Sequence, residues 1–166
     1  MLKLIKEDNL ILKTISSPWE FSEDNESARQ LEIDMVQAMI EHGGIGLAAN
    51  QVGLDKRVFA IHLKSQVPFC MFNPEIISLD TEECLGDEGC LSFPNLWLQV
   101  KRPKEIKAKY LDRSGKEFII ELKGIDARCF LHELDHLNGV CFVERVSKLK
   151  LAMAVKKQRK KNGRTK

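Results

Sequence analysis

The chain has 166 residues, 43% hydrophobic and 30% charged, which is typical of one globular domain with its own core. No apolar run approaches the ~18 residues that a bilayer-spanning helix needs, which excludes a membrane-spanning protein. The net charge of +2 is unevenly distributed, because residues 147–166 carry nine Lys or Arg and no acid while residues 1–146 carry 17 basic and 24 acidic residues. Such a tail is either a solvated chain end or a segment attracted to a polyanion such as RNA.

The N-terminal segment MLKLIKEDNLILK alternates charged and apolar residues. It lacks the continuous apolar core and small-residue cleavage site of a signal peptide, and it is not the Arg- and Ser-rich type of an organellar presequence. We therefore expect a cytoplasmic protein. The five cysteines are an odd number, and together with the missing signal peptide they argue against a disulfide framework.

The first half of the chain predicts one helix and two strands. Apolar residues recur at helical spacing over residues 25–42, and Gly43 and Gly44 then end the predicted helix. The runs RVFAIHL (57–63) and FCMFNPEII (69–77) are rich in β-branched and aromatic residues and predict strands.

The second half predicts a hairpin followed by two helices. The runs 98–111 and 116–124 read as strands, and the DRSG turn (112–115) between them favours a hairpin. Helical spacing returns over 125–138, and a last amphipathic helix is predicted over 147–161. Strands that are adjacent in sequence favour antiparallel sheets, so the predicted fold class is α+β.

The stretch HELDHLNGVCF contains the pattern H-E-x-x-H. His132 and His136 are four residues apart, so on a helix both imidazoles reach one ion. Glu133 is rotated by about 100° from His132 and borders that face without binding the ion. In one large group of metallopeptidases a third His follows, but here that position is Phe142.

A catalytic metal site needs a third protein ligand and one open position. Cys129 shares the face of His132, but three ligands on one short arc would crowd the ion, so Cys129 is interpreted as pocket lining. Cys90 lies in the glycine-rich stretch GDEGCLSFP, where the backbone can approach an ion closely. Spacing alone leaves two readings of Cys90 open, a metal ligand and a nucleophile with His132 as its base.

Three stretches occur in order along the chain, GIGLAANQ (44–51), EGCLS (88–92) and HELDH (132–136). Together they resemble the three motifs of the peptide deformylase family. The segment LDRSGK between the second and third motifs is also similar to that family, and the similarity extends from about Leu12 to Leu149.

The resemblance implies a metal held by Cys90, His132 and His136. The ion of the family is commonly Fe²⁺, with Zn²⁺, Ni²⁺ or Co²⁺ also accepted, and this ligand set does not choose among them. The implied activity is removal of the N-formyl group from the initiator methionine of nascent polypeptides, with release of formate.

The resemblance also implies a mechanism. The metal lowers the pKa of bound water from ~16 toward ~7, and the metal-bound hydroxide attacks the formyl carbon. Glu133 accepts the water proton as general base and returns it as general acid to the leaving amine. The Gln51 side-chain amide and the Leu91 backbone N–H stabilise the oxyanion, and one such donor is typically worth ~3 kcal/mol.

For substrate binding, the resemblance implies that Gly46 presents its backbone to the substrate backbone. Ile45, Ile125 and Cys129 are expected to line a pocket for the methionine side chain. Gly86 departs from the family pattern, because a larger apolar residue often helps line this pocket. Trp97 departs as well, because many members carry a basic residue in that segment.

The family fold is α+β, with antiparallel sheets around the central helix that carries HELDH, followed by a C-terminal helix. We therefore expect a catalytic domain over 1–146 and a C-terminal helix with a basic tail over 147–166. The tail is similar in position and charge to a helix that docks on the ribosome in some bacterial members, which implies ribosomal RNA as a partner. The expected substrates are N-formylmethionyl nascent peptides, and no membrane partner or homo-oligomer is expected.

Two rival functions come from other classes. A general H-E-x-x-H zinc peptidase would need a downstream third His or Glu, and Glu144 is the available acid. A non-enzymatic RNA-binding protein with a structural metal would have four protein ligands and would bind RNA through the basic tail.

Overall fold

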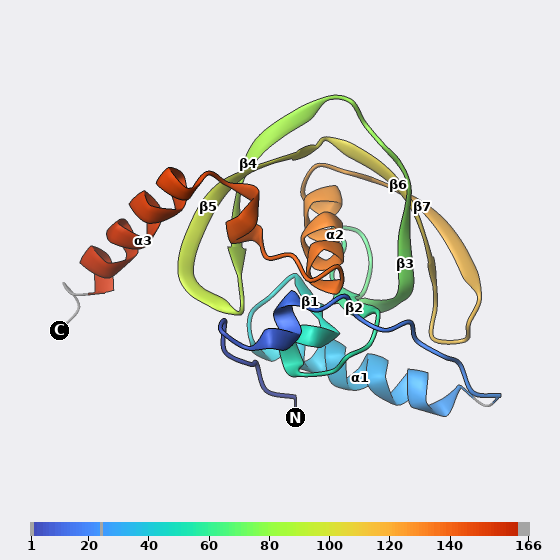
Figure 1. The fold of residues 1–166 in the computed structure, drawn as a ribbon. Helices are drawn as coiled ribbons and strands as arrows, with labels where there is room; N and C mark the ends of the chain where they lie inside the picture. The colour runs from blue at the N-terminus through green and yellow to red at the C-terminus, as the bar shows by residue number, and fades with distance from the viewer. Residues whose placement is uncertain (1, 24, 163–166) are drawn as a thin grey trace.

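Two antiparallel sheets enclose a central helix in the computed structural model, which describes residues 2–23 and 25–162 (Figure 1). In chain order the elements are η1 (Leu10–Lys13), α1 (Glu26–Glu41), β1 (Gly46–Ala48), η2 (Ala49–Val52), β2 (Val58–Ile61), β3 (Phe69–Leu79), β4 (Glu83–Cys90), β5 (Phe93–Pro103), β6 (Glu105–Leu111), β7 (Glu117–Lys123), α2 (Gly124–Leu137), η3 (Phe142–Arg145) and α3 (Lys148–Asn162). The predicted α+β class is confirmed.

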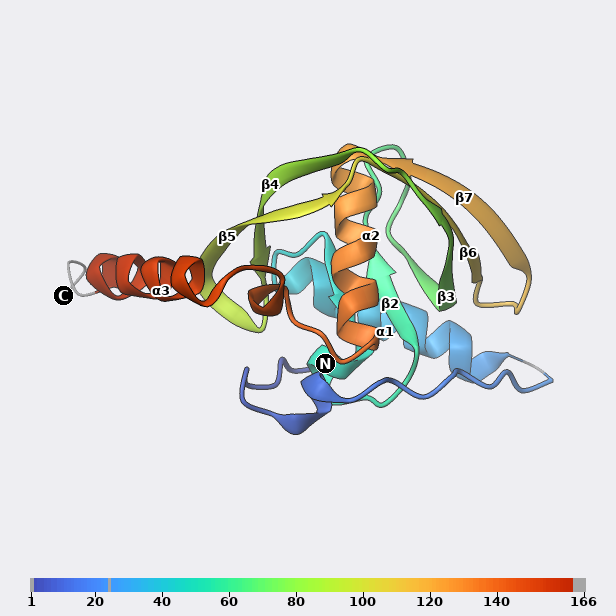
Figure 2. The same ribbon diagram turned by 45° about the horizontal axis from the view of Figure 1, so that its top comes forward.

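The larger sheet has five strands in the order β1-β2-β3-β6-β7, and the smaller sheet consists of β4 and β5. Every pairing is antiparallel. Figure 2 shows α2 between the two sheets, with β4 and β5 on one side and β6 and β7 on the other. Because α2 is enclosed in this way, residues 127–137 are all buried.

One face of α2 packs against the larger sheet. Ala127, Phe130, Leu134 and Leu137 belong to the core cluster of that sheet, and the ring of Phe130 meets Phe59 of β2 edge to face with 5.3 Å between centroids. The spacing of these residues by three and four fixes the rotation of the helix about its axis. His132 and His136 lie on the remaining face, toward the smaller sheet, whereas Glu133 lies against Gly46 of β1.

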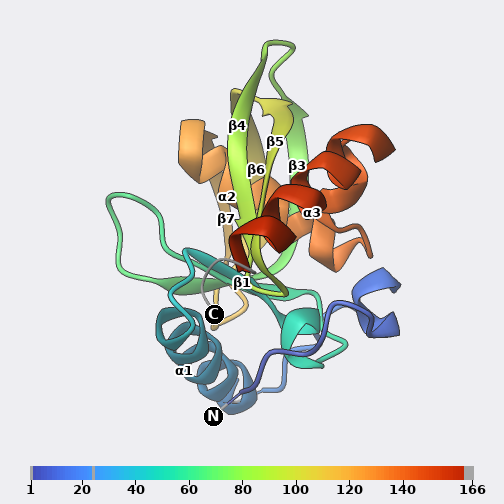
Figure 3. The ribbon, with the colours of Figure 1, turned by 90° about the vertical axis from the view of Figure 1, so that its left-hand side faces the viewer.

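The predicted helices are confirmed within a residue or two at each end. The helix expected over 25–42 is α1, which ends where Gly43 adopts a left-handed conformation (φ 72°). The helix expected over 125–138 is α2, and the last helix is α3. Figure 3 shows α3 beside β5, where the partly buried residues Leu151, Ala154 and Val155 join the core of the smaller sheet.

The prediction of one strand over 98–111 is wrong. Its first part belongs to β5 and pairs with β4, whereas its second part is β6 and pairs with β3 and β7. The change of sheet occurs at Lys104, which follows Pro103, a residue that cannot donate a ladder hydrogen bond. The predicted hairpin around the DRSG turn is confirmed, but it extends over residues 105–123 only, with Leu111 paired to Glu117.

The strand β4 was not predicted. Two glycines and several acids make its sequence resemble a loop, yet it pairs with β5 from Glu83 to Gly89 in unbroken register. Among the helices of residues 2–23 and 25–162, none has the length and apolar character required to cross a bilayer.

Candidate metal centre and active site

Three side chains from two elements converge beside α2. Cys90 ends β4, and His132 and His136 occupy successive turns of α2. Their sulfur and ring nitrogen atoms all lie within 4.8 Å of one another, with 3.2 Å between Cys90 Sγ and His136 Nε2. In the described part of the chain, this is the group of His, Cys and acidic side chains that is arranged to hold a metal ion.

Cys90 lies at a break in the β4–β5 ladder. Gly89 pairs with Trp97, but the next residue, Cys90, pairs with Phe93, so the register shifts at this point. The extra residues at this shift, 94–96, belong to β5, so β4 itself has no insertion. Cys90 follows Glu88 by two residues and lies on the same face of β4, and both side chains meet histidines of α2.

The Gln51 amide is fixed beside the sulfur of Cys90. Gln51 is only 1% exposed, and its Oε1 accepts from the Ala48 N–H at 2.9 Å. Its Nε2 lies 3.4 Å from Cys90 Sγ and 3.1 Å from Ser92 Oγ. Since the amide oxygen is engaged by β1, the amide nitrogen must point at the Cys/His group.

Glu88 orients His132 from behind. Its Oε2 lies 3.0 Å from His132 Nδ1, so the other ring nitrogen of His132 is directed at the metal group. The carboxylate also accepts from Arg102 at 2.9 and 3.0 Å and from Arg128 at 2.8 Å. Burial alone would raise the pKa of Glu88, but hydrogen bonds from His132 and Arg102 lower it to about 2.

The two imidazoles have different electrostatic environments. Burial alone would lower the pKa of His132, but hydrogen bonds with Cys90 and Glu88 raise it to about 10. Burial, with the nearby charge of His132, holds the pKa of His136 well below its usual range. The donor set of one cysteine sulfur and two imidazoles suits Zn²⁺ or Fe²⁺.

Glu133 adjoins the metal group and is 4% exposed. Burial raises the pKa of its carboxyl to about 7, while the charge of His132 opposes this shift. Its Oε2 is buried and has no hydrogen-bond partner among the described residues. An unpaired carboxylate oxygen whose pKa is near neutrality can exchange a proton with a group that enters the site.

Gly46 of β1 lies directly against this carboxylate. A Cβ on Gly46 would stand 2.3 Å from Glu133 Oε1 and 2.8 Å from its Cδ and Cγ. These separations are shorter than real Cβ contacts allow, so the placement of Glu133 depends on the missing side chain at position 46.

A cavity of about 620 Å³ opens over the metal group. Its lining includes the residues that the sequence assigned to catalysis and substrate binding, namely Gln51, Leu91, Glu133, Ile45, Gly46, Ile125 and Cys129. Ile45 and Ile125 are 49% and 53% exposed and lie at its mouth, whereas His136 is fully buried. The residues named from the sequence are thus gathered around one cavity.

The cavity also contains Arg128 and Glu88, which were not assigned a role from the sequence. Arg128 is 7% exposed and lines the wall, and Glu88 contacts both Arg128 and His132. Arg128 lies one helical turn before His132 and therefore on the same face of α2. A charged residue at that position of a buried helix could have indicated from the sequence that Arg128 belongs to the site. Trp97 is 66% exposed and stands at the edge of the cavity, over Gly89.

The residues at which a zinc peptidase would carry its third metal ligand have other contacts here. Phe142 is 1% exposed and packs on the ring of His132, with 5.6 Å between centroids. The Glu144 carboxylate accepts from Lys13 Nζ at 2.5 Å and from the Cys141 N–H at 2.9 Å. Asp135 accepts from Arg102 at 2.6 Å and pairs with Arg145, so it stands behind the ligands.

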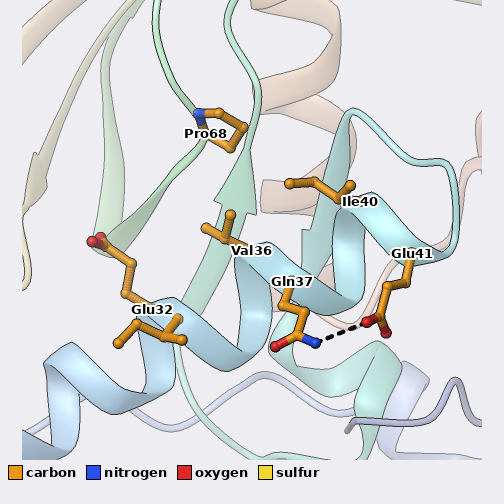
Figure 4. Close-up of a pocket in the computed structure, with 7 residues that line it drawn as sticks. Glu32, Val36, Gln37, Ile40, Glu41 and Pro68 are labelled. Atoms are coloured by element: carbon orange, nitrogen blue, oxygen red, sulfur yellow. Dashed lines mark hydrogen bonds between the residues drawn. The ribbon is translucent and has the colours of Figure 1, made fainter.

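A second hollow follows the outer face of α1 (Figure 4). It is lined by Glu32, Ile33, Val36, Gln37, Ile40, Glu41 and Pro68. Its polar groups are two carboxylates and one amide, and Gln37 donates to Glu41 at 2.8 Å. It shares no residue with the metal group.

Comparison with known proteins gives a consistent result. Residues 1–152 match the family described as Polypeptide deformylase. A peptide deformylase of Mesorhizobium japonicum is 42% identical over 154 residues, which covers 90% of this chain and 86% of the relative.

Two solved structures have the same fold. A peptide deformylase from Synechococcus elongatus in complex with actinonin superposes with a TM-score of 0.87 at 36% identity, covering 95% of this chain and 87% of that one. A Met-Ala-Ser-bound peptide deformylase from Acinetobacter baumannii gives 0.80 at 38% identity, covering 87% and 98%.

Proposed function

This chain belongs to the polypeptide deformylase family, and from that premise we propose which of its residues carry the reaction. The protein is a metal-dependent hydrolase that removes the N-formyl group from nascent polypeptides. The assignment of metal, catalytic and substrate-binding roles below rests on the geometry of the cavity.

Cys90, His132 and His136 are the proposed ligands of one divalent cation, with Fe²⁺ as the resident ion and Zn²⁺, Ni²⁺ or Co²⁺ as substitutes. The convergence of their ligand atoms within 4.8 Å supports this assignment. When bound there, the cation lowers the pKa of water and polarises the formyl oxygen. Glu88 holds the His132 ring in the orientation that binding requires.

Glu133 is the proposed general base and acid. It accepts a proton from the attacking water and passes this proton to the amine of the departing methionine. Its pKa of about 7 supports the assignment, because a group that titrates near neutrality can both take up and release a proton at that pH.

Gln51 and Leu91 are the proposed donors to the developing oxyanion. The Gln51 amide nitrogen is 3.4 Å from Cys90 Sγ, and Leu91 directly follows Cys90 in the cavity lining. Both donors are therefore adjacent to the proposed metal. Each should stabilise the transition state by about 3 kcal/mol, as single oxyanion donors do elsewhere.

The substrate is proposed to lie along β1, with Gly46 facing its backbone. Its methionine side chain would enter the cavity between Ile45 and Ile125, with Cys129 deeper in the wall. This is supported by their exposures, since the two isoleucines are half exposed while Cys129 is 7% exposed.

The observation that carries the proposal is the convergence of the thiol at the end of β4 with two imidazoles of α2 beside a buried carboxylate. A general zinc peptidase would recruit Glu144, which is instead bound to Lys13 and the Cys141 N–H. A structural metal would need four ligands, whereas the described residues offer three. Neither rival function is favoured.

The test is release of formate from formyl-Met-Ala-Ser, measured anaerobically with Fe²⁺ or in air with Ni²⁺. Cys90→Ala should lose the metal and all activity, and Glu133→Ala should keep the metal but lose activity. Glu144→Ala is the matched acidic control and should keep both. A wild-type protein with stoichiometric metal and no formate release would refute the proposal.

We further propose that residues 1–146 form the catalytic unit and that 147–166 attach the protein to ribosomal RNA, with the monomer as the cytoplasmic form. Because Leu151, Ala154 and Val155 pack on the smaller sheet, truncation should begin after Gln158. This truncation removes Arg159, Lys160, Lys161, Arg164 and Lys166. It should preserve formate release and weaken salt-sensitive binding to ribosomes. Unchanged binding would refute the role of the tail.

A further inference from the structure

The wall of the substrate cavity contains a buried guanidinium. Arg128 of α2 is 7% exposed and lines the cavity together with Ile125 and Cys129, which lie three residues before it and one after it. Its Nη1 lies 2.8 Å from Glu88 Oε1 and 2.8 Å from the Val100 carbonyl oxygen. Its Nη2 donates to the Cys84 carbonyl oxygen at 2.9 Å. The charge is thus paired, and the guanidinium is held from two sides.

Nη2 also lies 3.6 Å from Cys84 Sγ, so four of the five N–H donors of this guanidinium have acceptors and one is left over. Both terminal nitrogens have acceptors at 2.9 Å or less, but the Nε–H has no acceptor among residues 2–23 and 25–162. Among the described residues, several unpaired polar atoms are completely enclosed, but Arg128 Nε is not one of them. Part of the Nε surface is therefore accessible. A guanidinium has five N–H donors, and one that lines a cavity can donate its free N–H to a guest.

Gly86 of β4 makes room for this arrangement. A Cβ on Gly86 would stand 2.7 Å from both Cζ and Nε of Arg128 and 2.8 Å from Nη2. The guanidinium therefore lies against the Gly86 backbone, in the space that a side chain would fill. A larger residue at position 86 and the observed Arg128 conformation exclude one another.

We propose that Arg128, admitted by Gly86, is a specificity-determining residue that favours the thioether of methionine over a hydrocarbon side chain of the same length. This inference rests on the proposed placement of the methionine side chain in the cavity. The methionine sulfur is a weak hydrogen-bond acceptor that can meet the free N–H. A methylene in its place would cover that N–H without pairing it, which costs free energy.

Norleucine is the matched probe, because it replaces the sulfur of methionine with a methylene at nearly constant shape. The experiment compares kcat/KM of the metal-loaded enzyme for formyl-Met-Ala-Ser and formyl-norleucyl-Ala-Ser. The wild type should prefer methionine about three- to ten-fold, the range expected for one modest hydrogen bond. The difference should reside in KM, and Met-Ala-Ser should inhibit more tightly than norleucyl-Ala-Ser by a similar factor.

Two variants address the residue itself. Arg128→Met removes the donor, and Gly86→Ala displaces the guanidinium, so each should reduce the methionine preference toward one. Arg113→Met is the matched control, because Arg113 lies in the exposed β6–β7 turn and pairs with Glu32. It should retain the wild-type preference. A merely structural role for Arg128 would lower the rates for both substrates equally and leave the ratio unchanged.

The outcomes separate this inference from the proposed function. Active wild-type enzyme that does not distinguish the two peptides overturns the role of Arg128 but leaves deformylation intact. An unchanged preference in folded Arg128→Met overturns it as well. Arg128→Met loses the bonds to Cys84 and Val100 and could fail to fold. In that case the methionine preference of the wild type and of Gly86→Ala tests the inference. No formate from either peptide refutes the proposed function instead.

Discussion

Replacing Gly46 by alanine tests whether the buried carboxylate of Glu133 is held where the reaction needs it. Gly46 is in β1 and has no positive φ, so alanine is compatible with its backbone conformation. The added methyl group would stand 2.3 Å from Glu133 Oε1 and 2.8 Å from two further carbons of that side chain. The perturbation is therefore directed at one side chain.

The size of the effect follows from these separations. An ordinary carbon–oxygen contact is ~3.4 Å, so the carboxylate must move by about 1 Å or the strand must yield. Glu133 lines the cavity over the metal group, so the displaced carboxylate would move into that space and away from its position beside Gly46. A misplacement of 1 Å in a catalytic group typically lowers the rate by about 10²-fold. We expect Gly46→Ala to lose about 10²-fold in kcat.

The assay is formate release from formyl-Met-Ala-Ser, with metal content measured on the same samples. Gly46→Ala should keep its metal, because the three atoms nearest to the new methyl group all belong to Glu133 and none to the proposed metal ligands. Glu133→Ala should also lose about 10²-fold or more, the usual contribution of a general base. The double variant should be no slower than Glu133→Ala alone, because both changes act on the same group.

The control is Gly124→Ala at the start of α2. Gly124 has φ 58° and nothing within 4 Å of its Cβ position, so alanine there strains the backbone without touching a neighbour. It should lower the melting temperature while kcat stays near wild type. Gly46→Ala with normal kcat, or with effects that add to those of Glu133→Ala, would refute the assigned position of the carboxylate.

Two further predictions concern stability. The pKa of Glu88 is lowered to about 2 from 4.5, so its contribution is present above pH 4.5 and is lost as the pH falls toward 2. The shift corresponds to on the order of 3 kcal/mol. Urea unfolding of metal-free protein should show this loss, and Glu88→Gln should show a flatter profile; equal slopes would contradict it. Phe142→Ala should cost about 3–5 kcal/mol, as buried aromatic truncations do, yet leave the metal content unchanged. Loss of metal in a folded Phe142→Ala would show that this ring positions His132.

The sequence predicts most of the fold because helical periodicity is strong where one face is buried. Phe130, Leu134 and Leu137 mark the core face of α2, and Gly43 and Gly139 mark the ends of two helices. Strand β4 was missed because its residues do not alternate between apolar and polar. Its glycines serve close contacts instead, since Gly86 accommodates Arg128 and Gly89 lies against Trp97.

The candidate site was predictable where chemistry requires a particular residue type, and unpredictable where only contacts matter. The spacing of His132 and His136 indicates a shared ion, and the family motifs supply Cys90 and Gln51. Spacing does not show that Gly46 makes room for Glu133, because that contact joins β1 to α2 across about ninety residues. The free N–H of Arg128 also depends on which carbonyl groups of the smaller sheet lie nearby.

A buried network of charged side chains explains how a two-stranded sheet can hold the proposed metal ligand Cys90 in a fixed position. Glu88 of β4, Arg102 of β5 and Asp135 of α2 are all less than 7% exposed and are bonded in sequence, at 2.9 and 2.6 Å. Burying such charges costs desolvation energy, and apolar side chains could fill the same volume at lower cost. Each bond is directional, however, so one register of β4 against α2 satisfies all of them. That register places the sulfur of Cys90 beside His136, because Cys90 follows Glu88 by two residues.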